Sequence, residues 1–360
     1  MSAKSSDSDP RPAPPAVRGA VVWPSLLIVL ALTVAFAAGL HAPAWAQYLP
    51  FAASLVLFGL PHGAVDHLVP SRFSGRKADG RGILAVVLLY IFLSGLCLIL
   101  WFVAPAIAFA LFICVTVFHW GAGELHAALF FGPDGLGGLG PTGRVFLVLL
   151  RGGIPMLVPL LFFPDAYEGV AADAAGLFGP GAAPSWAFGP AFRLAAGAAL
   201  SVVALVLVSR AVRDGVARRA VFPPLALETL LLFAFFAVVP PILAVGLYFT
   251  IWHAPRHIAR LVLLDPGAST DFLAGRPGRA VSRFAKDAAP LTGLALALLA
   301  GLYFAVPRAA QDPGSLLALY LVLVSALTLP HASLVAYMDL RQGVWKRSLP
   351  PAGAGHGPVT

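Results

Sequence analysis

Residues 83–103 read ILAVVLLYIFLSGLCLILWFV, an uninterrupted run without a single charged side chain. About 20 apolar residues in helical conformation cross the hydrocarbon core of a bilayer, so this run predicts one membrane-spanning helix. Residues 289–306 form a second continuous run, and others recur along the chain. The strands of a membrane barrel would instead alternate in polarity over segments of about ten residues. The sequence therefore predicts an all-α, polytopic bundle of transmembrane helices.

Composition leads to the same class. Of the 360 residues, 59% are hydrophobic and 11% are charged, a balance that a soluble domain of this length could not bury. The formal net charge of +8 does not indicate nucleic acid as a partner, because the lysines and arginines are dispersed through short loops between apolar runs. Cys97 and Cys114 lie inside such runs without metal-type spacing, and we interpret both as small buried hydrophobic residues.

Polar segments and prolines between the apolar runs divide the chain into about ten predicted spans, with eight or nine as alternatives. Their expected limits are 21–40, 46–68, 83–103, 105–129, 145–163, 191–209, 222–239, 241–261, 289–306 and 315–338. The seventh and eighth are separated only by Pro240 and Pro241, so a kinked element or a re-entrant pair is an alternative there. The expected domains are a disordered cytoplasmic tail over 1–20, a single transmembrane catalytic domain over 21–340 and a cytoplasmic tail over 341–360.

The distribution of basic residues predicts the orientation. Cytoplasmic loops of membrane proteins accumulate lysine and arginine. With the N-terminus inside and ten spans, all of the 24 lysines and arginines except Arg193 and Arg308 fall on the cytoplasmic side. The outer loop after Phe163 is instead acidic, and we expect a short interfacial helix in it. Both termini are therefore predicted to be cytoplasmic, with the lipid bilayer as the partner of the bundle.

Seven of the nine histidines fall inside four of these spans. They lie in the stretches PHGAVDH (61–67), FHWGAGELH (118–126), WHAPRH (252–257) and LPH (329–331). In the predicted topology all four spans run from outside to inside, which places the seven imidazoles in one layer near the cytoplasmic side. Imidazoles that converge in an apolar medium suit iron, copper or zinc. His253 and His257, four residues apart, would share a helix face, although Pro255 between them can distort it.

The same layer holds few carboxylates. Metal-bound histidines usually donate their second N–H to a carboxylate or carbonyl, and Asp66 lies four residues after His62. We expect Asp66 and Glu124 to support ligands in this way, with Glu228 near the cytoplasmic start of the seventh span as a further candidate. Arg151 could pair with one of them, but we favour an arginine that extends to the membrane interface.

These motifs resemble the Brp/Blh family of bacterial membrane β-carotene 15,15′-dioxygenases over roughly residues 55–340. The resemblance rests on PHGAVDH, FHWG, the HxxRH pair at 253–257 and LPH before the end of the last helix. It implies cleavage of the central double bond of β-carotene by O₂, with Fe²⁺ as cofactor, into two molecules of retinal. It also implies a protein of the bacterial inner membrane whose product commonly serves a microbial rhodopsin.

Matched residue by residue, the resemblance places the iron ligands at His62, His119, His253 and His257. It does not carry over His67, His126 and His331 equally, and these remain candidates for additional ligands or for supporting roles. Two alternatives stay open from the residues themselves. One is a membrane di-iron desaturase or hydroxylase, which needs more histidine clusters than the single HxxxH found here. The other is a proton-coupled transporter in which histidines and carboxylates form a relay.

Overall fold

The structure, a computed structural model, describes residues 15–74, 78–131, 136–179, 185–219, 222–306 and 312–346. These residues form helices and no β-strand, as the sequence predicts. Eight helices in this part of the chain are long and apolar enough to cross a membrane, judged by length and composition. That number is the lower alternative to the ten expected spans. Residues 1–14 and 347–360, which make up most of the two predicted tails, lie outside the described residues.

Seven of the eight are continuous helices. Six of them lie within six residues of the predicted limits, whereas the helix that begins at Pro277 starts twelve residues before the expected limit of 289. The seven are α1 (Pro15–Ala37), α6 (Gly80–Val103), α7 (Pro105–Phe130), α8 (Pro141–Phe162), α10 (Pro190–Arg213), α15 (Pro277–Ala305) and α16 (Pro313–Arg341). The expected helix in the outer loop is present as α9 (Pro164–Gly176), and α14 (Pro266–Leu273) precedes α15. Short 3-10 turns η2 (Leu136–Gly138) and η3 (Ser185–Ala187) complete the connections.

The second predicted span is broken rather than continuous. It comprises α2 (Ala44–Gln47), α3 (Leu49–Ser54), α4 (Gly59–Ala64), the 3-10 turn η1 (Asp66–Leu68) and α5 (Val69–Ser74). Glycine and proline at positions 59, 61 and 63 explain why no single helix runs through. A broken helix is tolerated at membrane depth where protein covers its free backbone groups, and most of α4 is buried.

The seventh and eighth predicted spans also differ from expectation. Helix α11 (Phe222–Val238) is apolar but has only 17 residues, so it is not counted among the eight helices long enough to cross a membrane, each of which has at least 18. Beyond Pro240 the chain forms α12 (Pro241–Leu247), a π-helical segment η4 (Tyr248–His253) and α13 (Ala254–Leu264). The π-helical segment ends just before Pro255, whose missing N–H removes an α-helical hydrogen bond at this point.

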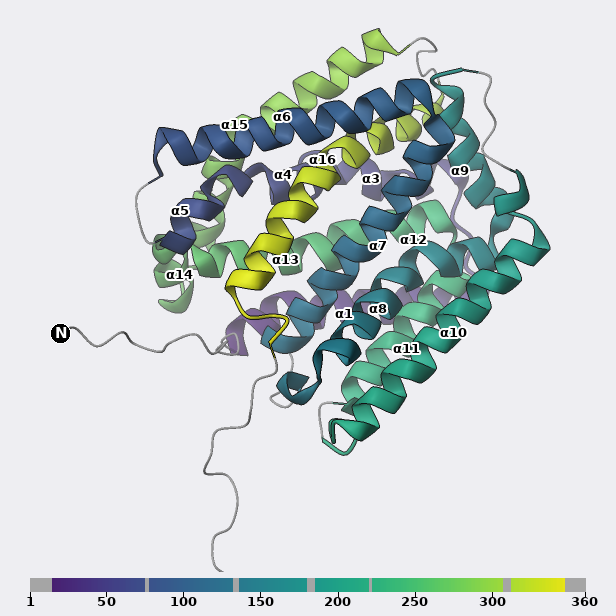
Figure 1. Cartoon of the computed structure of the whole chain (residues 1–360), viewed down its shortest axis with the longest axis horizontal. Helices are drawn as coiled ribbons and strands as arrows, with labels where there is room; N and C mark the ends of the chain where they lie inside the picture. Colours follow the sequence, from purple (N-terminus) through teal and green to yellow (C-terminus); the bar gives the residue numbers. More distant parts are fainter. Residues whose placement is uncertain are drawn as a thin grey trace, which may run out of the picture.

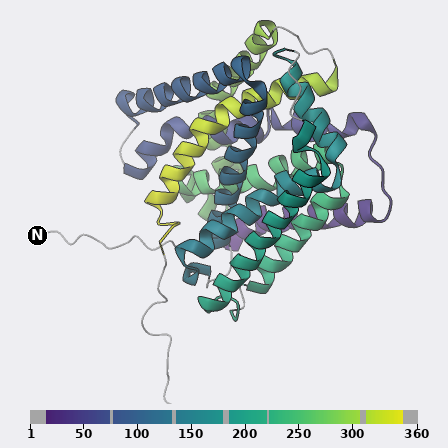
Figure 2. The ribbon, with the colours of Figure 1, turned by 45° about the vertical axis from the view of Figure 1, so that its right-hand side comes forward.

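The helices pack as one bundle around α7, α8 and α16 (Figure 1). Helix α7 lies against α8 along its length, and α16 contacts α6, α7 and α9. Figure 2 shows the same arrangement from another side, with α10 and α11 beside α8. Gly121 on α7 and Gly152 on α8 make the closest approach, because a β-carbon at either would collide with a backbone carbonyl of the opposite helix. The bundle therefore brings the histidine-bearing parts of α4, α7, α13 and α16 together.

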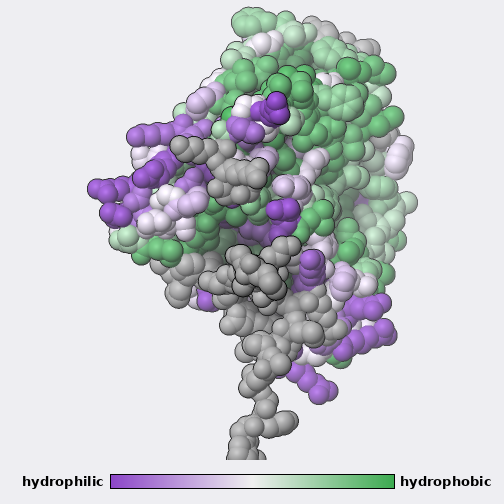
Figure 3. All heavy atoms as spheres, turned by 60° about the vertical axis from the view of Figure 1, so that its left-hand side comes forward, coloured by the Kyte–Doolittle hydropathy of each residue, from purple (hydrophilic) through white to green (hydrophobic). Residues whose placement is uncertain are grey.

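The outside of the bundle suits a lipid environment. Large apolar side chains such as Leu194, Val103 and Phe304 are more than three-quarters exposed. Figure 3 shows one face on which hydrophobic residues cover the upper and right-hand parts, while most hydrophilic residues gather at the left and in the lower part. The helix lengths and the apolar surface are therefore both consistent with a membrane protein.

The glycine contact between α7 and α8 gives a stability prediction. Gly121→Ala is expected to lower the free energy of unfolding by about 1–3 kcal/mol, because the methyl group meets the Val148 carbonyl. Gly95→Ala on α6 is the matched control, since a β-carbon there meets no atom within 4 Å and the helix gains up to about 1 kcal/mol. Thermal unfolding in detergent measures both, and equal midpoints would contradict the close contact.

Candidate metal centre

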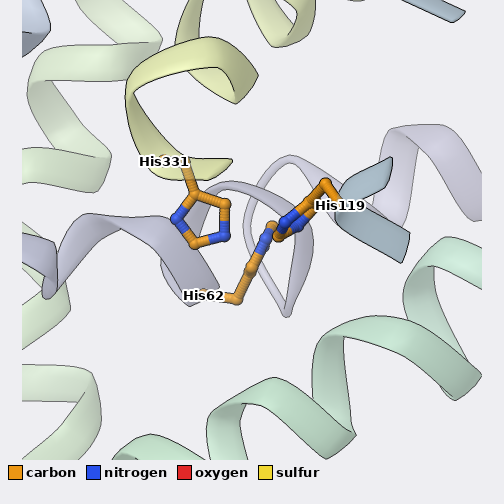
Figure 4. A group of neighbouring side chains, drawn as sticks. All are labelled: His62, His119 and His331. Carbon is orange, nitrogen blue, oxygen red and sulfur yellow. The ribbon is translucent and has the colours of Figure 1, made fainter. Parts of the chain in front are cut away.

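Three imidazoles from three different helices point toward one another in the middle of the bundle. His62 comes from α4, His119 from α7 and His331 from α16 (Figure 4). One nitrogen of each ring lies within 4.8 Å of a nitrogen of each of the others, and all three side chains are buried. These residues are far apart in sequence, so the group exists only because the helices pack as they do.

His253 and His257 complete a cluster of five imidazoles. Their ring centroids lie 5.8 Å and 5.6 Å from that of His62, and the Nε2 atoms of His253 and His119 are 3.1 Å apart. His253 is the last residue of the π-helical segment, whereas His257 lies in the first turns of α13. The distortion expected at Pro255 is therefore present, and both histidines still face the cluster. All four histidines singled out as ligands from the sequence lie together.

Asp66 supports His331, not His62 as the four-residue spacing suggests. The Nδ1 atom of His331 donates to Asp66 Oδ2 over 2.7 Å, and the Tyr90 hydroxyl donates to the same oxygen. His62 instead donates through Nδ1 to the Gly59 carbonyl. Helix α4 ends at Ala64, so Asp66 has left the helical path on which it would face His62. Tyr90 was missed from the sequence because it looks like any aromatic residue in the apolar run of α6.

Several buried ring nitrogens at the cluster have no hydrogen-bond partner among the residues that the structure describes. They include Nε2 of His257, Nε2 of His331 and Nδ1 of His119, together with Asp66 Oδ1. Buried polar atoms are nearly always paired, and an unpaired one in a membrane interior costs several kcal/mol. Two nitrogen ligands at about 2.1 Å and a right angle lie about 3 Å apart, close to the His253–His119 separation. The donor set therefore fits a first-row transition metal.

Two predicted candidates lie outside the cluster. His67 donates through Nδ1 to the Ala64 carbonyl over 3.1 Å and is only half-buried. His126 is buried and stacks on Phe130, with ring centroids 4.2 Å apart. Their motif neighbours His62 and His119 belong to the cluster, so spacing within a motif did not distinguish the two kinds of histidine.

The cluster forms one wall of an apolar cavity of about 370 Å³. His62, His119 and His331 line it together with Asp66 and Tyr90, and the remaining walls are largely aliphatic and aromatic side chains of α6, α7, α15 and α16. Phe249 and Trp120 also line the cavity, whereas Trp252 and Tyr248 pack behind the wall. The arrangement places clustered imidazoles against a space that suits an apolar molecule.

Comparison with known proteins identifies the family. The family model described as beta-carotene 15,15′-dioxygenase matches residues 53–339. The chain belongs to this family. The resemblance inferred from the four histidine motifs is thereby confirmed, and the di-iron desaturase and transporter alternatives lose their support.

The relatives are haloarchaeal and bacterial. "Probable beta-carotene 15,15′-dioxygenase Blh" of Halobacterium salinarum is 42% identical over 83% of this chain and 86% of its own length. "Probable beta-carotene 15,15′-dioxygenase Brp" of the same species is 30% identical over 89% of this chain and 92% of its own length. "Beta-carotene 15,15′-dioxygenase" of an uncultured marine bacterium, 66A03, is 32% identical over 21% of this chain. No solved structure matches the chain.

In this dioxygenase family member, Glu124 is connected to the cluster only through its neighbours. Its carboxylate accepts hydrogen bonds from Trp252 Nε1 over 2.8 Å and from Arg151, so it does not hold an imidazole as expected. Trp252 immediately precedes His253 in the π-helical segment, and the Arg256 guanidinium lies 3.9 Å above its ring. The hydrogen bond from Trp252 therefore links Glu124 to the segment that carries His253.

Arg151 is not at the membrane interface as expected. It is buried, forms an ion pair with Glu124, and lies 3.2 Å from Glu228 on α11. Glu228 therefore belongs to this ion-pair group and not to the imidazole cluster. A charged arginine inside a bundle needs an anionic partner, and the two glutamates supply it.

Gly123 and Gly63 make room for the imidazoles. A β-carbon on Gly123 would lie 3.2 Å from a ring carbon of His253, and one on Gly63 would lie 3.4 Å from Nδ1 of His331. The glycines that flank the histidine motifs therefore have two different uses. Gly121 brings the helices together, and Gly63 and Gly123 leave space beside the cluster.

The buried ion pair yields a second stability prediction. Arg151→Met is expected to cost about 3–5 kcal/mol, because Glu124 remains buried without its cation. The double variant Arg151→Met/Glu124→Gln should recover part of that loss, since the uncompensated charge is gone. Thermal unfolding in detergent measures each variant, with the exposed Arg213→Met as control. A double variant less stable than Arg151→Met would contradict the pairing.

Proposed function

We propose that this protein cleaves the central 15,15′ double bond of β-carotene with O₂ and releases two molecules of retinal. The observation that carries the proposal is that three clustered imidazoles, with Asp66, His67 and Tyr90 beside them, line one cavity whose remaining walls are largely apolar. Family membership and the printed activity of the relatives support the same reaction. We further propose that the protein works in the bacterial inner membrane and that its product supplies a microbial rhodopsin.

The cofactor in this proposal is Fe²⁺, held by His62, His119, His253 and His257. Neutral imidazoles bind a divalent iron without losing a proton and leave it cationic. His331, held by Asp66, lies close enough to the others to be a fifth ligand or to support the site from beside it. When bound, iron supplies the activation of O₂, and both oxygen atoms end in the two aldehydes as the double bond breaks.

The residues of the protein position the substrate and the histidines, and they keep water out of the cavity. The apolar walls of the cavity hold a rigid polyene through dispersion contacts. They also exclude water, which prevents side reactions with water during cleavage. Asp66 and Tyr90 fix the ring of His331, and Glu124 fixes the segment that ends at His253. The proposal requires no protein nucleophile.

Expression in a bacterium that accumulates β-carotene tests the reaction. Loss of β-carotene and formation of retinal, measured by chromatography, are the expected results. Metal analysis of the purified protein should give about one iron per chain, whereas two would favour a di-iron oxidase and none a transporter. Unchanged β-carotene despite verified membrane expression would refute the proposed activity.

The ligand assignment makes a separate prediction. Alanine in place of His62, His119, His253 or His257 is expected to abolish both bound iron and retinal formation, because each removes a nitrogen donor. His126→Ala is the matched control, since that buried ring lies outside the cluster. A variant of one of the four that keeps wild-type iron would remove that residue from the ligand set.

Asp66→Asn separates a ligand from a supporting group. We expect it to weaken iron affinity or activity about 10- to 100-fold, because the amide no longer holds the His331 ring as a carboxylate does. Iron binding is measured by titration, and His331→Ala is compared in parallel. Wild-type affinity in Asp66→Asn would show that the contact has no bearing on the metal.

A further inference from the structure

Three side chains belong to the cavity wall and to the outer surface of the bundle at the same time. They are Ile91 on α6 and Leu294 and Leu298 on α15, which line the cavity and are 65%, 53% and 50% exposed. Other lining residues, such as Leu60 at 8% and Val86 at 6%, show that facing the cavity contributes little exposure by itself. The three side chains are therefore exposed mainly on the outer surface of the bundle. At this place the wall of the cavity continues onto that surface.

Helices α6 and α15 lie at the same edge of the bundle (Figures 1 and 2). Each packs on α16, and α15 also packs on α4 whereas α6 packs on η1. The seam between α6 and α15 therefore has α16 beneath it and the histidine-bearing segments α4 and η1 beside it. Both sides of the seam are apolar at the positions that reach the cavity.

The floor of the seam leads to the imidazoles. Helix α16 contributes Val324, Leu327, Thr328 and His331 to the cavity, spaced as one face of a helix. With Leu321 one turn earlier, this face extends for about 15 Å at 1.5 Å per residue. It ends at His331, whose unpaired Nε2 belongs to the cluster. A continuous, mostly aliphatic track therefore connects the seam with the candidate metal centre.

We propose that the seam between α6 and α15 is a lateral entrance through which a polyene dissolved in the bilayer reaches the histidine cluster. This inference rests on the proposed function for the identity of its occupant. A long apolar chain partitions into lipid, so an opening that faces lipid admits it without passage through water. The exposed aliphatic side chains at the seam provide dispersion contacts and no group that must be desolvated.

Photo-crosslinking tests occupancy without turnover. The photoreactive residue p-benzoylphenylalanine replaces Ile91 or, as the matched control, Leu88, which is 55% exposed on the same helix but does not line the cavity. The iron-loaded protein in liposomes containing β-carotene is irradiated without O₂, so that no cleavage occurs. At least a threefold excess of carotenoid adduct at position 91 is expected. Equal yields at the two positions would overturn the entrance.

Kinetics provide the second test. Ile91→Trp and Leu298→Trp narrow the seam and should lower kcat/KM for β-carotene in liposomes about tenfold or more, with bound iron unchanged. Leu88→Trp and Phe304→Trp, on the same two helices but outside the cavity wall, should keep wild-type kcat/KM. Equal kcat/KM in all four variants would overturn the proposal.

Failure of the proposed function has a different signature. Wild-type protein with full iron that yields no retinal would refute β-carotene cleavage, while the crosslinking ratio between positions 91 and 88 would still decide whether a polyene enters at this seam. Retinal formation with equal crosslinking at both positions would uphold the activity and place the entrance elsewhere.

Discussion

The need to satisfy buried polar groups away from water governs this structure. Five imidazoles, a carboxylate and a tyrosine hydroxyl lie together inside a bundle whose exterior is apolar. Part of the requirement is met within the protein, since Asp66 accepts from His331 and Tyr90, and the Gly59 carbonyl accepts from His62. Among the described residues, the unpaired ring nitrogens include Nε2 of His257 and Nε2 of His331, which belong to the cluster and which a metal ion would satisfy. The same need for a partner explains why the buried guanidinium of Arg151 lies between two glutamates instead of at the membrane interface.

Irregular backbone appears where the site needs it. The segment that carries His62 and Asp66 is broken into short helices, and the segment that carries His253 passes through a π-helical turn before Pro255. Regular helices would have placed Asp66 beneath His62 and would have set His253 and His257 by simple four-residue spacing. The irregularities free Asp66 to reach α16 and turn His253 toward His119. Such distortions at membrane depth are stable because protein covers them.

Two groups of polar side chains, the imidazole cluster and the buried ion-pair group, lie on opposite sides of Trp252. Toward the cavity lie the imidazoles, and behind them lie Glu124, Arg151 and Glu228. The indole of Trp252 joins the two, because it donates to Glu124 and precedes His253 in the chain. The buried ion pair is thus a rigid support for one edge of the cluster. Glu124, Arg151 and Glu228 do not line the cavity, so none of these charges faces the apolar space in which a polyene would lie.

By itself the sequence determined the helical class, most helix limits, the family and the four clustered histidines, because long apolar runs and rare intramembrane histidines leave few alternatives. It did not determine that the second span is broken, that α11 is short, or that eight helices rather than ten in the described part of the chain are long enough to cross a membrane. Only the tertiary structure decided that His331 joins the cluster, that Asp66 serves it, and that Tyr90 and Trp252 support the site. Those contacts join residues from 24 to 265 positions apart, and such pairs are fixed by the packing of helices, which no local pattern encodes.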